Sequence, residues 1–145
     1  MDWYADWLSG FETNNKTFNA EQKMNYKTAN IFENKNELEL FLKTNEEPVV
    51  VIMEAAWCGS CQIMDPIFER IERLYKEKIN FVLIDTDSSE EISKEYGLDK
   101  LPSVLFYNEG NLIDQITGTV SYDALNEKMK TLLKDSTQNN MYNLK

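Results

Sequence analysis

Apolar residues divide most of the chain into short continuous runs and longer stretches with helical spacing. The runs 49–53 and 79–84 are apolar at nearly every position, as expected of strands in the middle of a sheet that are covered on both faces. The tetrapeptide Asn108-Glu109-Gly110-Asn111 separates two further runs and predicts a hairpin turn. The predicted strands are residues 26–31, 49–53, 79–84, 103–107 and 112–117.

Residues with helical spacing predict four helices between and after these strands. Capping-box spacing begins at Asn34, before a helix at 35–44, and again at Ser88, while Ser121 is a predicted cap for the final helix. Another helix follows the segment at residue 58. We expect its side that faces the sheet to carry Ile63, Met64, Ile67, Phe68, Ile71, Leu74 and Tyr75. The order βαβαβαββα predicts an α/β fold with a central mixed sheet flanked by helices.

The beginning of the chain precedes this pattern. Trp3, Trp7 and Phe11 recur four residues apart and would form an aromatic stripe on a helix. The stripe either packs on the outside of the domain as an extra N-terminal helix or forms a docking face for a partner or a second copy. The polar residues at the other end are predicted to fray. The predicted organisation is an N-terminal extension and linker (1–25), one domain (26–134) and a C-terminal tail (135–145).

Composition and charge narrow the classes of partner. A chain of 145 residues suits one domain with a sizeable core. Its 15 basic and 25 acidic residues give a formal net charge of -10, which disfavours nucleic acid and anionic membrane surfaces. The first residues lack the pattern of a secretory signal, and no apolar run has membrane-spanning length. We therefore expect a cytoplasmic protein, unless a signal has been removed, and the frequent Asn and Lys suggest a bacterial source.

Both cysteines of the chain stand together in Trp57-Cys58-Gly59-Ser60-Cys61, at the end of a predicted central strand and at the head of a predicted helix. A thiolate at a helix N-terminus is stabilised by the helix dipole and by unpaired N–H groups, so we expect Cys58 to be ionised near neutral pH. Cys61 lies one turn further along, close enough to attack a mixed disulfide formed on Cys58. The pair can therefore cycle between dithiol and disulfide.

Two other roles for the cysteine pair are open. A structural zinc site wants four ligands, and a chain with two cysteines and no histidine would have to recruit carboxylates. A static disulfide would close a two-residue loop and add little stability. The absence of histidine also excludes Cys-His and Ser-His nucleophile pairs. The sequence thus favours a redox site with no metal and no bound cofactor.

The motif, its preceding strand and two downstream prolines resemble the thioredoxin family. Pro66 lies five positions after the second cysteine, and Tyr96-Gly97-Leu98-Asp99-Lys100-Leu101-Pro102-Ser103 follows the third predicted strand. The usual thioredoxin motif has proline where Ser60 stands. The resemblance covers residues 26–134 and implies a thioredoxin fold.

The resemblance also implies roles for single residues. Cys58 would be the exposed nucleophile and Cys61 the shielded, resolving cysteine. Leu101-Pro102 resembles the family's cis-proline loop, whose backbone is offered to an extended substrate strand. Trp57 would shield the sulfurs and line the substrate groove; the alternative is a core aromatic. The residues implied for the groove are Trp57, Gly59, Ser60, Leu101, Pro102, Thr117 and Gly118.

The sequence departs from the family in the positions that assist proton transfer. Thioredoxin usually has a buried aspartate and a lysine near its second cysteine, and those positions hold Ile52 and Phe81 here. Glu54, on the same strand face as Ile52, is a candidate substitute proton acceptor. The alternative is a solvated carboxylate at the strand end. Lys100 replaces the family's groove glycine, which would narrow that rim and add a positive charge.

The implied function is a thiol–disulfide oxidoreductase that reduces protein disulfides in the cytoplasm, with roles in electron transport and cell redox homeostasis. A separate reductase or a small thiol would supply electrons to a monomer. The direction of electron flow follows the reduction potential, so the same motif could serve an oxidant. The alternative function is an accessory protein that holds a partner through its N-terminal aromatic segment, with the cysteines secondary.

Overall fold

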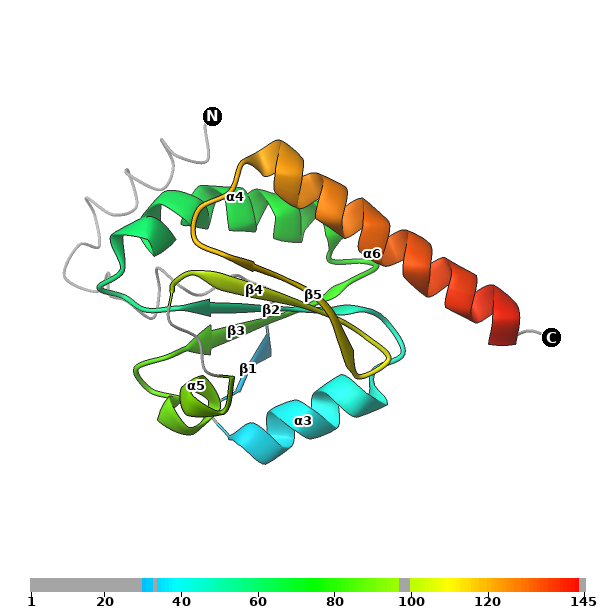
Figure 1. Cartoon of the computed structure of the whole chain (residues 1–145), viewed down its shortest axis with the longest axis horizontal. Coiled ribbons are helices and arrows are strands. Elements are labelled where there is room, and N and C mark those ends of the chain that lie inside the picture. The colour runs from blue at the N-terminus through cyan, green and yellow to red at the C-terminus, as the bar shows by residue number, and fades with distance from the viewer. Residues whose placement is uncertain (1–29, 33, 97–99, 144–145) are drawn as a thin grey trace.

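Figure 1 shows the computed structural model, which describes residues 30–32, 34–96 and 100–143. Its elements follow the predicted order βαβαβαββα. They are β1 (Asn30–Ile31), α3 (Lys35–Thr44), β2 (Val49–Glu54), α4 (Gly59–Tyr75), β3 (Asn80–Asp85), α5 (Glu90–Tyr96), β4 (Ser103–Asn108), β5 (Asn111–Thr117) and α6 (Tyr122–Asn143). The predicted N-terminal helix with Trp3, Trp7 and Phe11, and most of the predicted strand 26–31, lie outside the described residues.

The strands form one mixed sheet with β2 at its centre. Their order is β1-β3-β2-β4-β5; β2 runs parallel to β3 and antiparallel to β4. Val51 of β2 is opposite Val82 on one side and Leu105 on the other. Figure 1 shows α4 and α6 on one face of the sheet and α3 and α5 on the other. The predicted mixed sheet flanked by helices is therefore confirmed.

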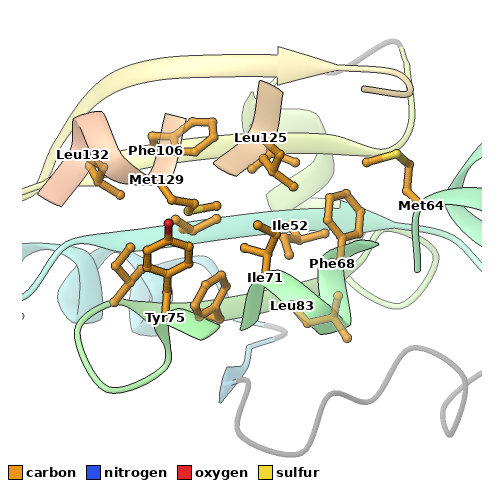
Figure 2. Packing of buried hydrophobic residues seen from close by; sticks show 14 residues of the cluster. Ile52, Met64, Phe68, Ile71, Tyr75, Leu83, Phe106, Leu125, Met129 and Leu132 are labelled. Atoms are coloured by element: carbon orange, nitrogen blue, oxygen red, sulfur yellow. The ribbon is translucent and has the colours of Figure 1, made fainter. Parts of the chain in front are cut away.

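The apolar run of β2 is explained by these two covered faces, because all six of its residues are buried. Val50 and Ile52 point into a core shared with α4 and α6, which Figure 2 shows in close-up. Val49, Val51 and Met53 belong to a second core under α3 and α5. Alternate side chains of a strand point to opposite faces of the sheet, so a strand that contributes to two cores carries apolar side chains on both faces.

Local signals place the ends of several elements as predicted. The Asn34 side-chain oxygen accepts the N–H groups of Asn36 and Glu37 at 2.7 and 3.2 Å and so caps α3. The β4–β5 hairpin turns through Glu109 and Gly110, both with positive φ (53° and 83°). Two consecutive residues of positive φ match the right-handed twist of the strands, which sets their register.

Two apolar residues of α4 do not face the sheet. Ile63 and Leu74 are 67% and 57% exposed, whereas the other predicted positions are buried or half-buried. With about 100° of rotation per residue, Ile63 and Leu74 lie roughly 140° and 120° around the helix from Phe68, which is fully buried. The apolar spacing predicted the helix correctly but assigned too wide a buried face.

The ends of two other helices also differ from the sequence prediction. The hydroxyl of Ser88 donates to the Asp85 carbonyl at 3.4 Å, so the predicted cap at Ser88 is wrong; α5 begins at Glu90. The final helix continues to Asn143, past residue 135, from which the chain was predicted to fray. Extending a formed helix adds a hydrogen bond per residue without a new nucleation cost. None of the helices described is both long and apolar enough to cross a membrane.

Candidate active site

Cys58 lies at the junction of the central strand and α4. It is the N-cap of α4, with φ -84° and ψ 114°, and its Sγ accepts the Cys61 N–H at 3.1 Å. The first N–H groups of a helix have no partner within the helix, and an N-cap side chain usually supplies oxygen for one of them. Here a sulfur takes that place. Cys58 therefore accepts a backbone N–H at the positive end of the helix dipole. The residue is only 6% exposed, so the expectation of an exposed first cysteine is wrong: both cysteines are buried.

Cys61 lies in a different environment one turn along the helix. It is 2% exposed and packs with Ala55, Cys58 and Leu101 in a small cluster. Burial raises the pKa of the Cys61 thiol well above its usual value, and the hydrogen bond with Cys58 and the negative charge of Glu54 act in the same direction. Cys61 is therefore a protonated thiol at neutral pH. Both cysteines are free thiols in this structure.

Glu54 is completely buried at the end of β2, with 0% exposure. This excludes the alternative of a solvated carboxylate at the strand end. Its strand lies between β3 and β4, and its carbonyl accepts the N–H of Thr86 at 2.9 Å and the Thr86 hydroxyl at 3.3 Å. Two residues earlier, Ile52 shares a wholly apolar core cluster with Phe81. The carboxylate thus lies nearer the motif than the family's usual aspartate position.

Trp57 is 70% exposed, which excludes the interpretation of this residue as a core aromatic. Its indole Nε1–H donates to Oδ1 of Asp87 at 3.1 Å. Asp87 is a site residue that was not predicted from the sequence. A signal was present, because Asp87 follows β3 and the motif follows β2, and the carboxyl ends of parallel strands meet at one edge of a sheet. The exposed indole is therefore held in place beside the cysteines.

The cis-proline side of the site packs directly against the motif. The Leu101–Pro102 peptide bond is cis, as the family resemblance implied, and Leu101 contacts the cysteine cluster. The Pro102 carbonyl accepts the Gly118 N–H at 2.8 Å, with Gly118 at φ 83°. Thr117, which is exposed, pairs with Ser103 at the end of the β4–β5 ladder. These contacts hold Leu101 against the thiols, while Thr117 and Gly118 support the loop from β5.

Gly59 and Ser60 form the first turn of α4 between the cysteines. A Cβ on Gly59 would meet no atom within 4 Å, so the surface beside Cys58 is open, while Ser60 is half-buried. The described residues contain no group of three or more His, Cys, Asp or Glu side chains arranged for a metal ion. The arrangement instead offers two adjacent thiols in unlike environments, near a buried carboxylate. Such a pair can carry out thiol–disulfide exchange.

Comparisons with known proteins agree with this chemistry. The Thioredoxin family model matches residues 29–131. Thioredoxin from Mycoplasmoides gallisepticum is 40% identical over 97 residues, which cover 67% of this chain and 95% of that protein. The chloroplastic Thioredoxin Y2 of Arabidopsis thaliana is 30% identical over 99 residues, 68% of this chain and 59% of the relative.

Solved structures show the same relationship. Mitochondrial thioredoxin 3 from Saccharomyces cerevisiae, in its oxidised form, superimposes with a TM-score of 0.66 at 29% identity, covering 73% of this chain and 97% of that one. The predicted thioredoxin fold is thereby confirmed, and none of these relatives favours the alternative of an interaction module. The chain belongs to the thioredoxin family of thiol–disulfide oxidoreductases.

Proposed function

We propose that this protein reduces disulfide bonds in other proteins, with Cys58 as the attacking cysteine and Cys61 as the resolving cysteine. The observation that carries the assignment is the difference between the two thiols. Cys58 accepts an N–H at the start of α4, whereas Cys61 is buried and its pKa is raised. The first thiol is thus placed to act as a nucleophile, and the second stays protonated until it is needed.

The exchange takes place in two balanced steps. The Cys58 thiolate attacks one sulfur of the client disulfide, a mixed disulfide forms, and the other client sulfur leaves as a thiolate. Cys61 then loses its proton and attacks the Cys58 sulfur, which releases the second client thiolate. Two electrons pass to the client, and the Cys58–Cys61 disulfide forms. A reductase or a small thiol must then return two electrons to the protein.

Glu54 is the proposed proton acceptor for Cys61 in the second step. Its carboxylate is buried near the thiol, and its charge contributes to the raised pKa of Cys61. Ile52 and Phe81, at the family's usual positions for this task, carry no titratable group. A base close to the resolving thiol shortens the lifetime of the mixed disulfide because it removes the proton as the sulfur attacks.

The proposed client groove consists of groups around the cysteines that are exposed or half-buried, except for Pro102, which is buried. Trp57, Gly59 and Ser60 form one side, and Leu101 and Pro102 form the other, with Thr117 and Gly118 behind them. The Leu101 backbone forms no hydrogen bond within the part of the chain described here, so its N–H and C=O remain open to an added strand. These are the features that an extended client segment needs.

The proposed setting is the cytoplasm of a bacterium, with the protein acting as a monomer on disulfide-containing proteins and on no nucleic acid. The formal charge of -10 supports the exclusion of nucleic acid. The relative from Mycoplasmoides gallisepticum supports a bacterial setting, whereas other relatives are chloroplastic. Fractionation of cells that produce the full chain would test the location.

Insulin reduction driven by dithiothreitol tests the function. The wild-type protein should accelerate the reaction, and Cys58→Ser should abolish the acceleration. Cys61→Ser should stop after one attack and accumulate a covalent adduct between Cys58 and the insulin chain, which mass spectrometry identifies. Circular dichroism checks that both variants fold. Full activity of Cys61→Ser would contradict the two-cysteine cycle, and an inactive wild-type protein would contradict the function.

A further inference from the structure

Lys100 stands beside the cysteines on the cis-proline side of the site. It is exposed and directly precedes Leu101, which packs against Ala55 and both cysteines. Its carbonyl oxygen accepts the hydroxyl of Ser103 at 2.6 Å, so the backbone at this position is held in place. Among the described residues Lys100 makes no ion pair. Its ammonium group is therefore available to a charged partner.

The open backbone of Leu101 places a bound client close to this ammonium group. A client strand that pairs with Leu101 advances by about 3.3 Å per residue, while an extended lysine side chain spans about 6 Å and a client glutamate adds about 4 Å. A client residue within three positions of the attacked cysteine thus lies within reach of Lys100. The client side chain that such a cation attracts is a carboxylate.

We propose that Lys100 selects clients that carry an acidic side chain within three residues of the cysteine that Cys58 attacks. This inference rests on the proposed function. The net charge of -10 repels acidic peptides at long range. At physiological ionic strength the Debye length is about 8 Å, so distant charges are largely screened and the nearby charge of Lys100 sets the preference among clients. An exposed ion pair of this kind changes a rate constant by about twofold to fivefold.

The test uses three disulfide-bonded peptides that differ only in having Glu, Gln or Lys two positions from the attacked cysteine. The second-order rate constant of reduction is measured with the reduced full chain. The wild-type protein should prefer Glu over Gln and Gln over Lys, by about twofold to fivefold at each step, and high salt should narrow the range. Lys100→Gln should lose the preference, and Lys100→Glu should reverse it.

Lys78→Glu is the matched control, because it makes the same change of net charge at an exposed position beyond the far end of α4. It should keep the wild-type order of peptides. If Lys78→Glu shifts the order as much as Lys100→Glu does, or if Lys100→Glu keeps the wild-type order, the inference is overturned. Equal wild-type rates on all three peptides also overturn it while leaving the proposed function intact. If the wild-type protein reduces neither these peptides nor insulin, the proposed function fails and the inference fails with it.

Discussion

The surroundings of Cys58 and Cys61 differ although the two residues lie one helical turn apart. Cys58 accepts a backbone N–H at the helix start, beside the open surface around Gly59. Cys61 is packed under Leu101 and feels the negative charge of Glu54, and its pKa is raised. The helix start, burial and a neighbouring charge together thus give two identical side chains unlike surroundings.

Alkylation should show the largest effect. Iodoacetamide at pH 7.5 should modify Cys61 at least about a hundredfold more slowly than Cys58, because the thiolate is the reactive form and burial disfavours it at Cys61. Peptide mass spectrometry over time measures both rates. In guanidinium the two cysteines should react alike. Equal rates in the folded protein would remove the asymmetry on which the proposed mechanism depends.

Glu54→Gln should slow the resolving step about tenfold to a hundredfold at pH 7, because the buried base is lost. Stopped-flow release of an aromatic thiol from Cys58 measures this step. The deficit should shrink as pH rises, since hydroxide then takes the proton. Glu72→Gln removes another buried carboxylate, roughly 16 Å along α4 from Cys61, and should leave the rate unchanged. An unaltered pH profile in Glu54→Gln would exclude Glu54 as the acceptor.

The raised pKa of Cys61 should make the stability of the reduced protein depend on pH. Because the folded-state pKa is raised, the contribution is fully present below the unfolded value of about 8.5 and is lost as pH rises above it. Between pH 7.5 and 9.5 the wild-type protein should lose about 1 kcal/mol of unfolding free energy from this group. Urea titrations measure the loss. The unfolding free energy of Cys61→Ser should fall less over the same pH range, by that amount. If the wild-type and Cys61→Ser proteins lose the same unfolding free energy, the assignment is refuted.

Asp87→Ala should have the smallest effect. Without its acceptor, the Trp57 indole N–H should exchange with solvent about twofold to tenfold faster, as expected for a hydrogen bond of modest net strength. The indole resonance in NMR spectra, assigned with Trp57→Phe, measures the exchange. Asp87→Asn retains an oxygen acceptor and should exchange at nearly the wild-type rate. Unchanged exchange in Asp87→Ala would mean that the indole is held by packing alone.

Features with a local cause could be predicted from the sequence. Asn34 caps α3 through N–H groups two and three residues away, and the hairpin at Gly110 depends on residues that adopt positive φ. The apolar run of β2 indicated two covered faces, and the spacing of the cysteines indicated their chemistry. The cis bond before Pro102 was expected from family resemblance rather than from local physics.

Features decided by distant contacts could not be predicted in the same way. The burial of Glu54 depends on strands and a loop that close over the end of β2, and a charged residue at a strand end has no local pattern that distinguishes it from a solvated one. Ile63 and Leu74 contribute to helical spacing although they face outward. The bond from Trp57 to Asp87 joins residues 30 positions apart, so it required the parallel pairing of β2 with β3.

The connection between β3 and α5 has a further consequence for how this site can vary. Thr86 donates to the carbonyl of Glu54, and the next residue, Asp87, accepts the indole of Trp57. Two adjoining residues thus hold both the buried Glu54 and the exposed Trp57 of the candidate site. An insertion in this connection would displace the Glu54 carboxylate and the Trp57 indole together, so a change here would alter the proposed client contact and the proposed proton acceptor at the same time.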